Sequence, residues 1–320
     1  MKKFFRAFGY PDVVWFPKTE RSFLGFICVS FILAMFITPY PQYAMWAGFL
    51  FAAYAAIAND SIQTIGTFIA SNQDKKWWVL WIFIGGIFFF TMFYSWLTLG
   101  GDVSHGRLTS KGFEIAPTEF HFLQIAAPIF LLILTRLRMP VSTTFILLTS
   151  FAATPAAVGG VLAKSMSGYI LSFILGLVFF LIVAKASKKY FVGKAKFGWT
   201  IAQWITSGTL WSVWLMQDAA NIAVYLPRSL STGEFMGFTG VVVIGLGLLL
   251  YYKGGRIQKI VTEKSVVTDV RFATLIDLIY CVILFYFKLH SKVPMSTTWV
   301  FIGLLAGREL GMALMKTGDN

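Results

Sequence analysis

The chain has 320 residues, of which 57% are apolar and only 13% are charged. Soluble domains carry about a quarter charged residues, so this composition excludes an ordinary soluble protein and places the chain in a lipid bilayer. The net charge of +13 could suggest nucleic-acid binding, but the basic residues fall between apolar stretches and form no compact basic module. We therefore expect an integral membrane protein, surrounded by lipid, that binds no nucleic acid.

Residues 1–21 are basic and aromatic, and no small-residue cleavage site follows a short apolar core. We interpret them as a cytoplasmic or interfacial lead-in and not as a removable signal peptide. Apolar stretches then follow that are long enough to cross a hydrocarbon core, which takes roughly 17–25 helical residues. They predict an all-α polytopic membrane protein with about 10 membrane segments, at 22–39, 43–58, 77–99, 119–135, 143–163, 168–184, 197–216, 235–252, 272–287 and 297–315.

The basic residues also predict the orientation. With the N-terminus in the cytoplasm, most of the 27 Lys and Arg residues lie in inner segments, as the positive-inside rule requires. We therefore expect a plasma (inner) membrane protein with a cytoplasmic N-terminus. A basic linker at 185–196 separates two halves, 22–184 and 197–320. An odd number of predicted crossings separates equivalent segments of the two halves. The second half is therefore expected to enter the membrane from the opposite face, as an inverted repeat of the first.

One short pattern occurs twice. MPVSTTF at 139–145 returns as VPMSTTW at 293–299, 154 positions later (296 − 142 = 154). Each copy follows an acid within an apolar stretch, Asp60 in AIANDSIQTIG and Asp218 in WLMQDAANIA. An acid and a Pro-x-Ser-Thr-Thr turn, both duplicated in an apolar chain, indicate an ion-coupled transporter built from two repeats. Helix breakers after the first turn, at Thr154-Pro155 and Gly159-Gly160, could make stretch 143–163 a re-entrant hairpin,.

The Pro-x-Ser-Thr-Thr turns have the chemistry of an anion site. Pro140 and Pro294 cannot continue a preceding helix, and the serine two positions later can cap a new one. Backbone N–H groups and hydroxyls at the positive end of such a helix suit phosphate, sulfate or a carboxylate. The alternative is a simple helix cap. The candidate anion ligands are Ser142, Thr143, Thr144, Ser296, Thr297 and Thr298.

The two acids indicate a cation site. A carboxylate near the middle of a membrane costs about 2.5–3.5 kcal/mol on insertion scales, so it is normally paired, protonated or bound to a cation. Amide side chains surround both acids: Asn59 and Gln63 flank Asp60, while Gln217 and Asn221 flank Asp218. Carboxylate and carbonyl oxygens suit Na⁺, and a carboxyl of raised pKa suits H⁺. The alternative is a buried polar network that fixes helix packing.

Further polar residues and both cysteines also lie within the predicted membrane stretches. Asp277 lies 153 positions after Gln124 and could supply a further cation ligand or a hydrogen bond between helices. Arg308-Glu309 is interpreted as an interfacial pair, with an anion contact as the alternative. Cys28 and Cys281 lie far apart and suggest packing residues,. We expect no transition-metal site and no cofactor apart from the coupling ion.

These motifs resemble those of the inorganic phosphate transporter (PiT) family, whose halves each carry a Gly-Ala-Asn-Asp-Val-Ala-Asn type motif and a Pro-x-Ser-Thr-Thr motif. Here the first motif reads IANDSIQ at 57–63 and LMQDAAN at 215–221. Ile57 and Leu215 replace the motif glycines, Gln63 and Gln217 replace shorter amides, and Ser61 replaces an apolar residue. The chain is similar to the family over nearly its whole length.

The resemblance implies an inverted-repeat transporter in which two helical hairpin regions meet at the membrane centre, and cation-coupled uptake of inorganic phosphate. By this similarity Asn59 and Asn221 would join the Ser-Thr-Thr triplets in holding the anion. By the same similarity Asp60 and Asp218 would hold the cation, Na⁺ before H⁺. The further candidate cation ligands, from the residues themselves, are Gln63, Gln217 and Asp277. A homo-oligomer is also expected. The alternatives are a permease for sulfate or another oxyanion, with H⁺ as a further option for coupling, and an ion channel. An enzyme is not expected, because no nucleophile with a base stands out.

Overall fold

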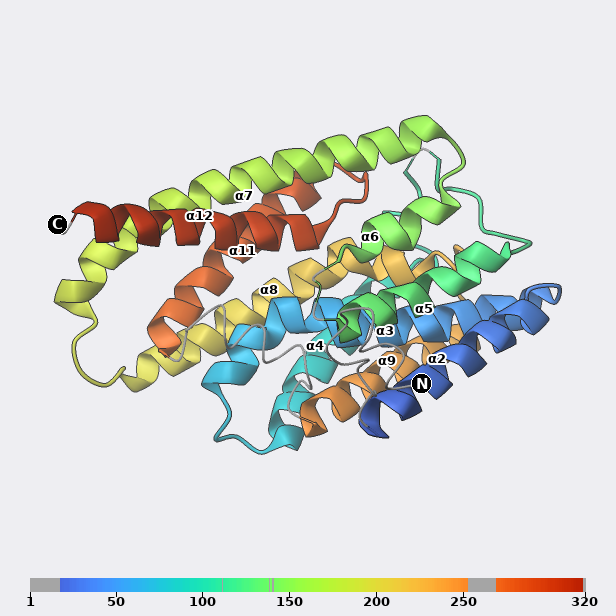
Figure 1. The fold of residues 1–320 in the computed structure, drawn as a ribbon, viewed down its shortest axis with the longest axis horizontal. Helices are drawn as coiled ribbons and strands as arrows, with labels where there is room; N and C mark the ends of the chain where they lie inside the picture. Colours follow the sequence, from blue (N-terminus) through green and yellow to red (C-terminus); the bar gives the residue numbers. More distant parts are fainter. Residues whose placement is uncertain (1–17, 111, 138, 140, 253–268, 319–320) are drawn as a thin grey trace, which may run out of the picture.

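A computed structural model describes residues 18–110, 112–137, 139, 141–252 and 269–318, and throughout these ranges the chain forms helices joined by turns and loops (Figure 1). The lead-in up to residue 17 and Pro140 of the first turn lie outside the described residues. The elements are α2 (Lys18–Ile37), α3 (Pro41–Ser71), α4 (Trp77–Thr98), α5 (Phe122–Arg136), α6 (Thr143–Ile146), the 3₁₀ helix η1 (Leu148–Phe151), α7 (Pro155–Tyr190), α8 (Phe197–Ala223), α9 (Thr232–Tyr251), α11 (Val270–His290) and α12 (Thr297–Gly318).

The helices have the length and surface of membrane helices. Five of those described are long and apolar enough to cross a bilayer: α4, α7, α9, α11 and α12. Large apolar side chains such as Phe36, Phe90 and Ile182 stand exposed on the outside of the bundle, where lipid replaces water. The prediction of a helical membrane protein is confirmed.

Three of the predicted stretches have clearly different bounds in the structure. The stretch predicted at 43–58 extends as α3 to Ser71, because the polar residues of the motif face the protein interior and do not end the helix. The stretch at 143–163 is not one crossing. It consists of α6, η1, a turn and the start of α7, which Pro155 opens as the first helical residue,. From there α7 runs without interruption through Gly159-Gly160 and includes the separate stretch predicted at 168–184.

The packing of the helices repeats between the two halves. The helix that carries the first acid, α3, packs on α5, and the helix that carries the second, α8, packs on α11. The contacts between halves are reciprocal, since α4 packs on α8 while α9 packs on α3. Asn72, just after α3, donates to Gln203 near the start of α8 over 3.0 Å, so these two helices are antiparallel. Antiparallel motif helices with reciprocal contacts are the arrangement that an inverted repeat produces.

Helix α7 packs mainly along α12, and the two helices run in the same direction (Figure 1). Gly303, Gly307 and Gly311 recur every four residues on the contacting face of α12. A Cβ at Gly307 would lie 2.7 Å from the backbone nitrogen of Leu177, so the two backbones approach very closely. Small residues at this spacing are typical of tight helix pairs in membranes. Although the expected division assigned most of α7 to the first half, its main contacts are with the second.

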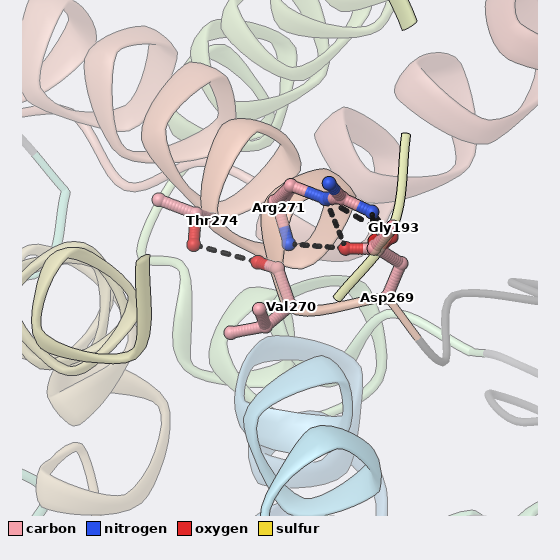
Figure 2. Close-up of polar contacts among 5 residues, drawn as sticks. All are labelled: Gly193, Asp269, Val270, Arg271 and Thr274. Carbon is pink, nitrogen blue, oxygen red and sulfur yellow. Dashed lines mark hydrogen bonds and ion pairs between the residues drawn. The ribbon is translucent and has the colours of Figure 1, made fainter. Parts of the chain in front are cut away.

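The loop before α8 is attached to the start of α11 (Figure 2). Asp269 caps α11 by accepting from the backbone of Arg271 over 2.8 Å. The Arg271 guanidinium binds the same carboxylate at 2.6 Å and donates to the carbonyl of Gly193 over 3.0 Å. It also lies over the ring of Phe191, 5.0 Å from its centroid. These contacts join the linker between the halves to a helix of the second half.

The described residues of the connection from α4 to α5, 99–110 and 112–121, fold as an ordered cap at the C-terminal end of α4. The Asp102 carboxylate accepts from the backbone nitrogens of Ser104 and Gly106, over 2.6 and 2.7 Å. Gly101 has a positive φ of 94°, and a Cβ there would lie 2.9 Å from the backbone nitrogen of Leu230. The cap is therefore folded tightly enough to bury Arg107 inside the protein.

Candidate functional site: two acids and two hydroxyl-rich turns

The first acid is bonded to the first turn. Asp60, on α3, accepts from the amide of Asn59 over 2.7 Å and from the hydroxyl of Thr143 over 2.5 Å. Asn59 also donates to the carbonyl of Val141 over 2.9 Å. These side chains are almost fully buried, with Asp60 2% exposed. Direct hydrogen bonds therefore join the acid and its neighbour Asn59 to a turn that is distant in sequence.

The second acid repeats this arrangement on α8. Asp218 accepts from the amide of Asn221 over 2.8 Å and from the hydroxyl of Thr297. The same amide of Asn221 also donates to Thr143 over 3.0 Å. Since Thr143 binds Asp60, the two acids and both turns belong to one continuous cluster. We call this set, Asn59, Asp60, Thr143, Asp218, Asn221 and Thr297, the central cluster.

Within each turn the three hydroxyls have different partners. The serine caps the following helix, since Ser142 accepts from the backbone of Phe145 over 3.3 Å and Ser296 from that of Trp299 over 3.2 Å. The first threonine binds the acid, as described above. The second threonine donates to the backbone of the other turn. All six side chains are buried: Ser142, Thr143, Thr144, Ser296, Thr297 and Thr298.

The amides occupy exchanged positions in the two halves. The shorter amide binds the acid in each case, but Asn59 precedes Asp60 by one residue whereas Asn221 follows Asp218 by three. The longer amides bind elsewhere. Gln63 donates to the side chain of Asn59 over 3.3 Å, and Gln217 donates to the carbonyl of Leu284 over 3.0 Å.

Two oxygens beside Asp218 lack a hydrogen-bond partner among the described residues, the side-chain carbonyls of Gln217 and Asn221. Both side chains are 1% exposed. They are four residues apart on α8 and so share one face of the helix, and Asn221 lies three residues after the acid that it binds,. A buried carbonyl without a partner is costly. A carboxylate with two such carbonyls is a set of ligands that a hard cation prefers.

A small cavity borders the second acid but not the first. Asp218 and Ser61 are polar residues in its wall, and Ile57 and Leu215, the residues at the motif-glycine positions, also line it. Ile57 extends toward α9, where a Cβ on Gly245 would lie 2.5 Å from its Cδ1 atom. Gly245 on α9 therefore makes room for the Ile57 side chain on α3. The remaining wall is formed by Ala53, Ala56, Phe88, Trp211, Trp214, Ala219, Ile222 and Val242.

Asp277 lies in a polar group of its own. Its carboxylate accepts from Thr67 of α3 over 2.7 Å and from Ser207 of α8, and thus joins three helices. Gln124, which precedes Asp277 by about one repeat, has different surroundings at the start of α5, where it accepts from the backbone of His121 over 2.9 Å. The observed contacts of Asp277 are those of an interhelical hydrogen-bonding group, and its role as a cation ligand stays a prediction.

Two buried cations near the site were not recognised in the sequence. With a cytoplasmic N-terminus, the predicted stretches place Arg107 and Lys164 in outer connecting segments, yet in the structure they are only 2% and 9% exposed. Burial lowers the pKa of Arg107 to about 10, which leaves it charged at neutral pH. Lys164 falls between the predicted stretches 143–163 and 168–184. A single continuous helix across both would place Lys164 inside the membrane, where a charged residue is normally functional. Arg308 instead pairs with its neighbour Glu309 over 3.0 Å, and the interfacial position of this pair stays a prediction.

No family model and no curated protein sequence matches the chain. Among solved structures, the fold is similar to one described as "The sodium-dependent phosphate transporter", with a TM-score of 0.57 over 85% of this chain and 89% of that one. The sequences are 15% identical over this match. The likeness shows that the chain has the fold of a helical membrane transporter.

Proposed function

We propose that the protein is a cation-coupled symporter of inorganic phosphate, with Na⁺ as the coupling ion. The observation that carries this proposal is the central cluster, in which Asn221 links Asp218 to Thr143 and so connects two buried acids with two hydroxyl-rich turns. The similar solved structure is described as a sodium-dependent phosphate transporter, which supports the choice of substrate and ion. The proposal includes a plasma-membrane location and a cytoplasmic N-terminus.

The shared hydroxyls suggest how cation and anion binding are coupled. In the structure, Thr143 and Thr297 donate to the carboxylates of Asp60 and Asp218. A cation bound by a carboxylate would compete with these hydrogen bonds and lower the negative charge of the cluster. The hydroxyls would then be free to donate to an oxyanion. Cation binding thus favours anion binding, and by linkage the reverse also holds.

The roles within the site follow from the positions of the groups. Asp218 with the free carbonyls of Gln217 and Asn221 forms the best-formed cation site. Asp60 with Asn59 and Gln63 forms the second site. The six Ser and Thr residues of the turns supply donors for phosphate. The exchange of access between the two membrane faces would involve relative movement of the two halves, as in other inverted-repeat transporters.

The test is phosphate uptake by the purified protein in liposomes. An inward Na⁺ gradient is expected to drive accumulation of radiolabelled phosphate above its equilibrium level, and Asp60→Asn or Asp218→Asn to abolish that accumulation. Sulfate as competitor and a pH gradient without Na⁺ separate the alternatives of another oxyanion and of H⁺ coupling. Flux that only dissipates a phosphate gradient, and ignores both cation gradients, would identify a channel instead.

A further inference from the structure

Arg107 and Lys164 approach the same backbone oxygen from different elements. Arg107, in the cap at 99–121, donates to the carbonyl of Ser291, and Lys164, on α7, donates to that carbonyl over 3.1 Å. Lys164 also donates to the carbonyl of Val293, and Arg107 to that of Met216 over 3.2 Å. Two side-chain cations therefore meet at one short segment, residues 291–293.

Their charges have no anionic partner within hydrogen-bonding distance in the described part of the chain. Every hydrogen bond that these two side chains make there ends on a neutral backbone carbonyl. Buried charges are stable when they are paired with an opposite charge, and two like charges at one carbonyl oxygen repel each other. Asp218 is close enough for its charge to act on Arg107, but no hydrogen bond joins these two side chains in the described part of the chain. Two cations therefore face one acid, and a further anion would complete the group.

The position of the pair connects it to the central cluster. Residues 291–293 lead directly into the second Pro-x-Ser-Thr-Thr turn, which begins at Pro294. Met216, whose carbonyl binds Arg107, lies two residues before Asp218. In the proposed orientation the cap at 99–121 faces the outside, so the pair lies between the outer surface and the cluster.

We propose that Arg107 and Lys164 form a second oxyanion subsite that receives inorganic phosphate from the outer side before it reaches the central cluster. The guanidinium offers a planar fork of donors and the ammonium a compact charge, which together suit a tetrahedral oxyanion. The carbonyls of Ser291 and Val293 hold these donors until the anion replaces them. That replacement releases the segment before the second turn. The inference rests on the proposed function for the identity of the anion.

The test is equilibrium binding of radiolabelled phosphate to the purified protein in detergent. Arg107→Gln and Lys164→Gln are each expected to weaken phosphate binding about tenfold or more, because hydrogen bonds to charged groups are the strong ones. Lys164→Arg keeps the charge and is expected to bind within about threefold of the wild type. Lys194→Gln removes an exposed charge from the inner linker and serves as the matched control.

Binding of radiolabelled Na⁺ separates an anion role from a structural one. A subsite predicts that Lys164→Gln weakens phosphate binding and leaves Na⁺ binding near its wild-type level. Equal loss of both ions, or phosphate affinity within about twofold of the wild type, would overturn the proposal, as would a wild type that binds no phosphate. If Arg107→Gln does not fold, Lys164→Gln and Lys164→Arg decide the matter. Phosphate binding that depends on both Arg107 and Lys164, in a protein that shows no Na⁺-driven uptake, would refute the symporter and keep the subsite.

Discussion

Thr144 and Thr298 hydrogen-bond across the boundary between the halves, each to the backbone of the other's turn. Thr144 donates to the carbonyl of Met295 over 3.2 Å, and Thr298 donates to that of Val141 over 3.5 Å. Donors and acceptors are separated by the same interval, since 298 − 144 and 295 − 141 both equal 154. Next to them, Phe145 and Trp299, which are also 154 residues apart, pack with ring centroids at 4.9 Å. The two turns therefore contact each other directly.

Removing the crossed hydrogen bonds should loosen the contact between the turns. We expect Thr144→Val and Thr298→Val each to destabilise the protein by about 1 kcal/mol, the typical net value of one hydrogen bond, and more where the bonded carbonyl is left buried without a partner. The measurement is the Tm in detergent, followed by tryptophan fluorescence. Thr98→Val, which removes an exposed hydroxyl bonded within α4, is the control. Equal Tm changes for Thr98→Val and Thr144→Val would contradict a stabilising role for the crossed hydrogen bonds.

Removing the hydroxyl that binds an acid should affect transport more than stability. Thr143→Val keeps the shape of the side chain but removes the hydroxyl that donates to Asp60 and accepts from Asn221. We expect Na⁺-driven phosphate uptake to fall at least about tenfold, because hydrogen bonds to charged groups contribute about 1.5–3 kcal/mol. Thr143→Ser restores the hydroxyl and is expected to recover most of the uptake. Failure of serine to restore uptake above the valine variant would count against a role for the hydroxyl.

The contact between α7 and α12 depends on glycine. Gly307→Ala would place a methyl group against the backbone of Phe173 and Leu177, which cannot move aside as a flexible side chain would. We expect a loss of stability of about 1–3 kcal/mol, the usual cost of overpacking. Gly240→Ala, on α9, has open space around the added carbon. It should leave the Tm unchanged or raise it, since alanine favours helix over glycine. The reverse order of the two Tm values would show that the close approach is wrong.

The Asp269 carboxyl makes the stability of the start of α11 depend on pH. Hydrogen bonds from Arg271 hold the pKa of Asp269 below its ordinary value of 3.8. A carboxyl whose pKa is lower in the folded state stabilises the fold above its unfolded-state pKa, and this contribution is lost as pH falls through the folded-state pKa. Asp269→Asn should therefore lower the Tm at pH 7, and the difference from the wild type should shrink below pH 3.8.

Asp74 provides the comparison for this pH series. Its carboxylate pairs with the neighbouring Lys75 over 2.8 Å, but the Asp74 side chain is 69% exposed. Exposed pairs of this kind contribute little to stability. Asp74→Asn should leave the Tm unchanged at pH 7. A Tm difference for Asp269→Asn that stays constant from pH 7 to pH 3 would exclude the proposed ion pair as its cause.

Much of the fold was accessible from the sequence because the bilayer limits the possible structures. Apolar stretches predicted most helices, and the duplicated turns correctly identified Ser142 and Ser296 as helix caps. The apolar criterion failed where polar residues face inward, so α3 was predicted to end before Asp60. It also failed at 143–163, where an apolar stretch contains a turn before Pro155. Hydropathy measures composition and is insensitive to a change of direction within an apolar segment.

The sequence indicated which residues form the candidate site, but not the hydrogen bonds that connect them. Spacing alone indicated the acids and turns, but not that Asn221 would join the two halves, because that hydrogen bond depends on the docking of α8 against α6. The sequence did not indicate that Arg107 and Lys164 lie close together, because they belong to different segments of the chain. The folded cap brings Arg107 to the segment that Lys164 contacts. Contacts between distant segments follow from tertiary structure and leave no periodic signal in the sequence.

The most direct test of cation coupling is the effect of Na⁺ on phosphate affinity in the purified protein. The coupling described above predicts that replacing K⁺ with Na⁺ strengthens phosphate binding by about 5–150-fold, the usual range for linked sites. It also predicts that Asp218→Asn removes this difference between the two cations. Equal phosphate affinity of the wild type in Na⁺ and K⁺ at constant pH would contradict Na⁺ coupling at the central cluster.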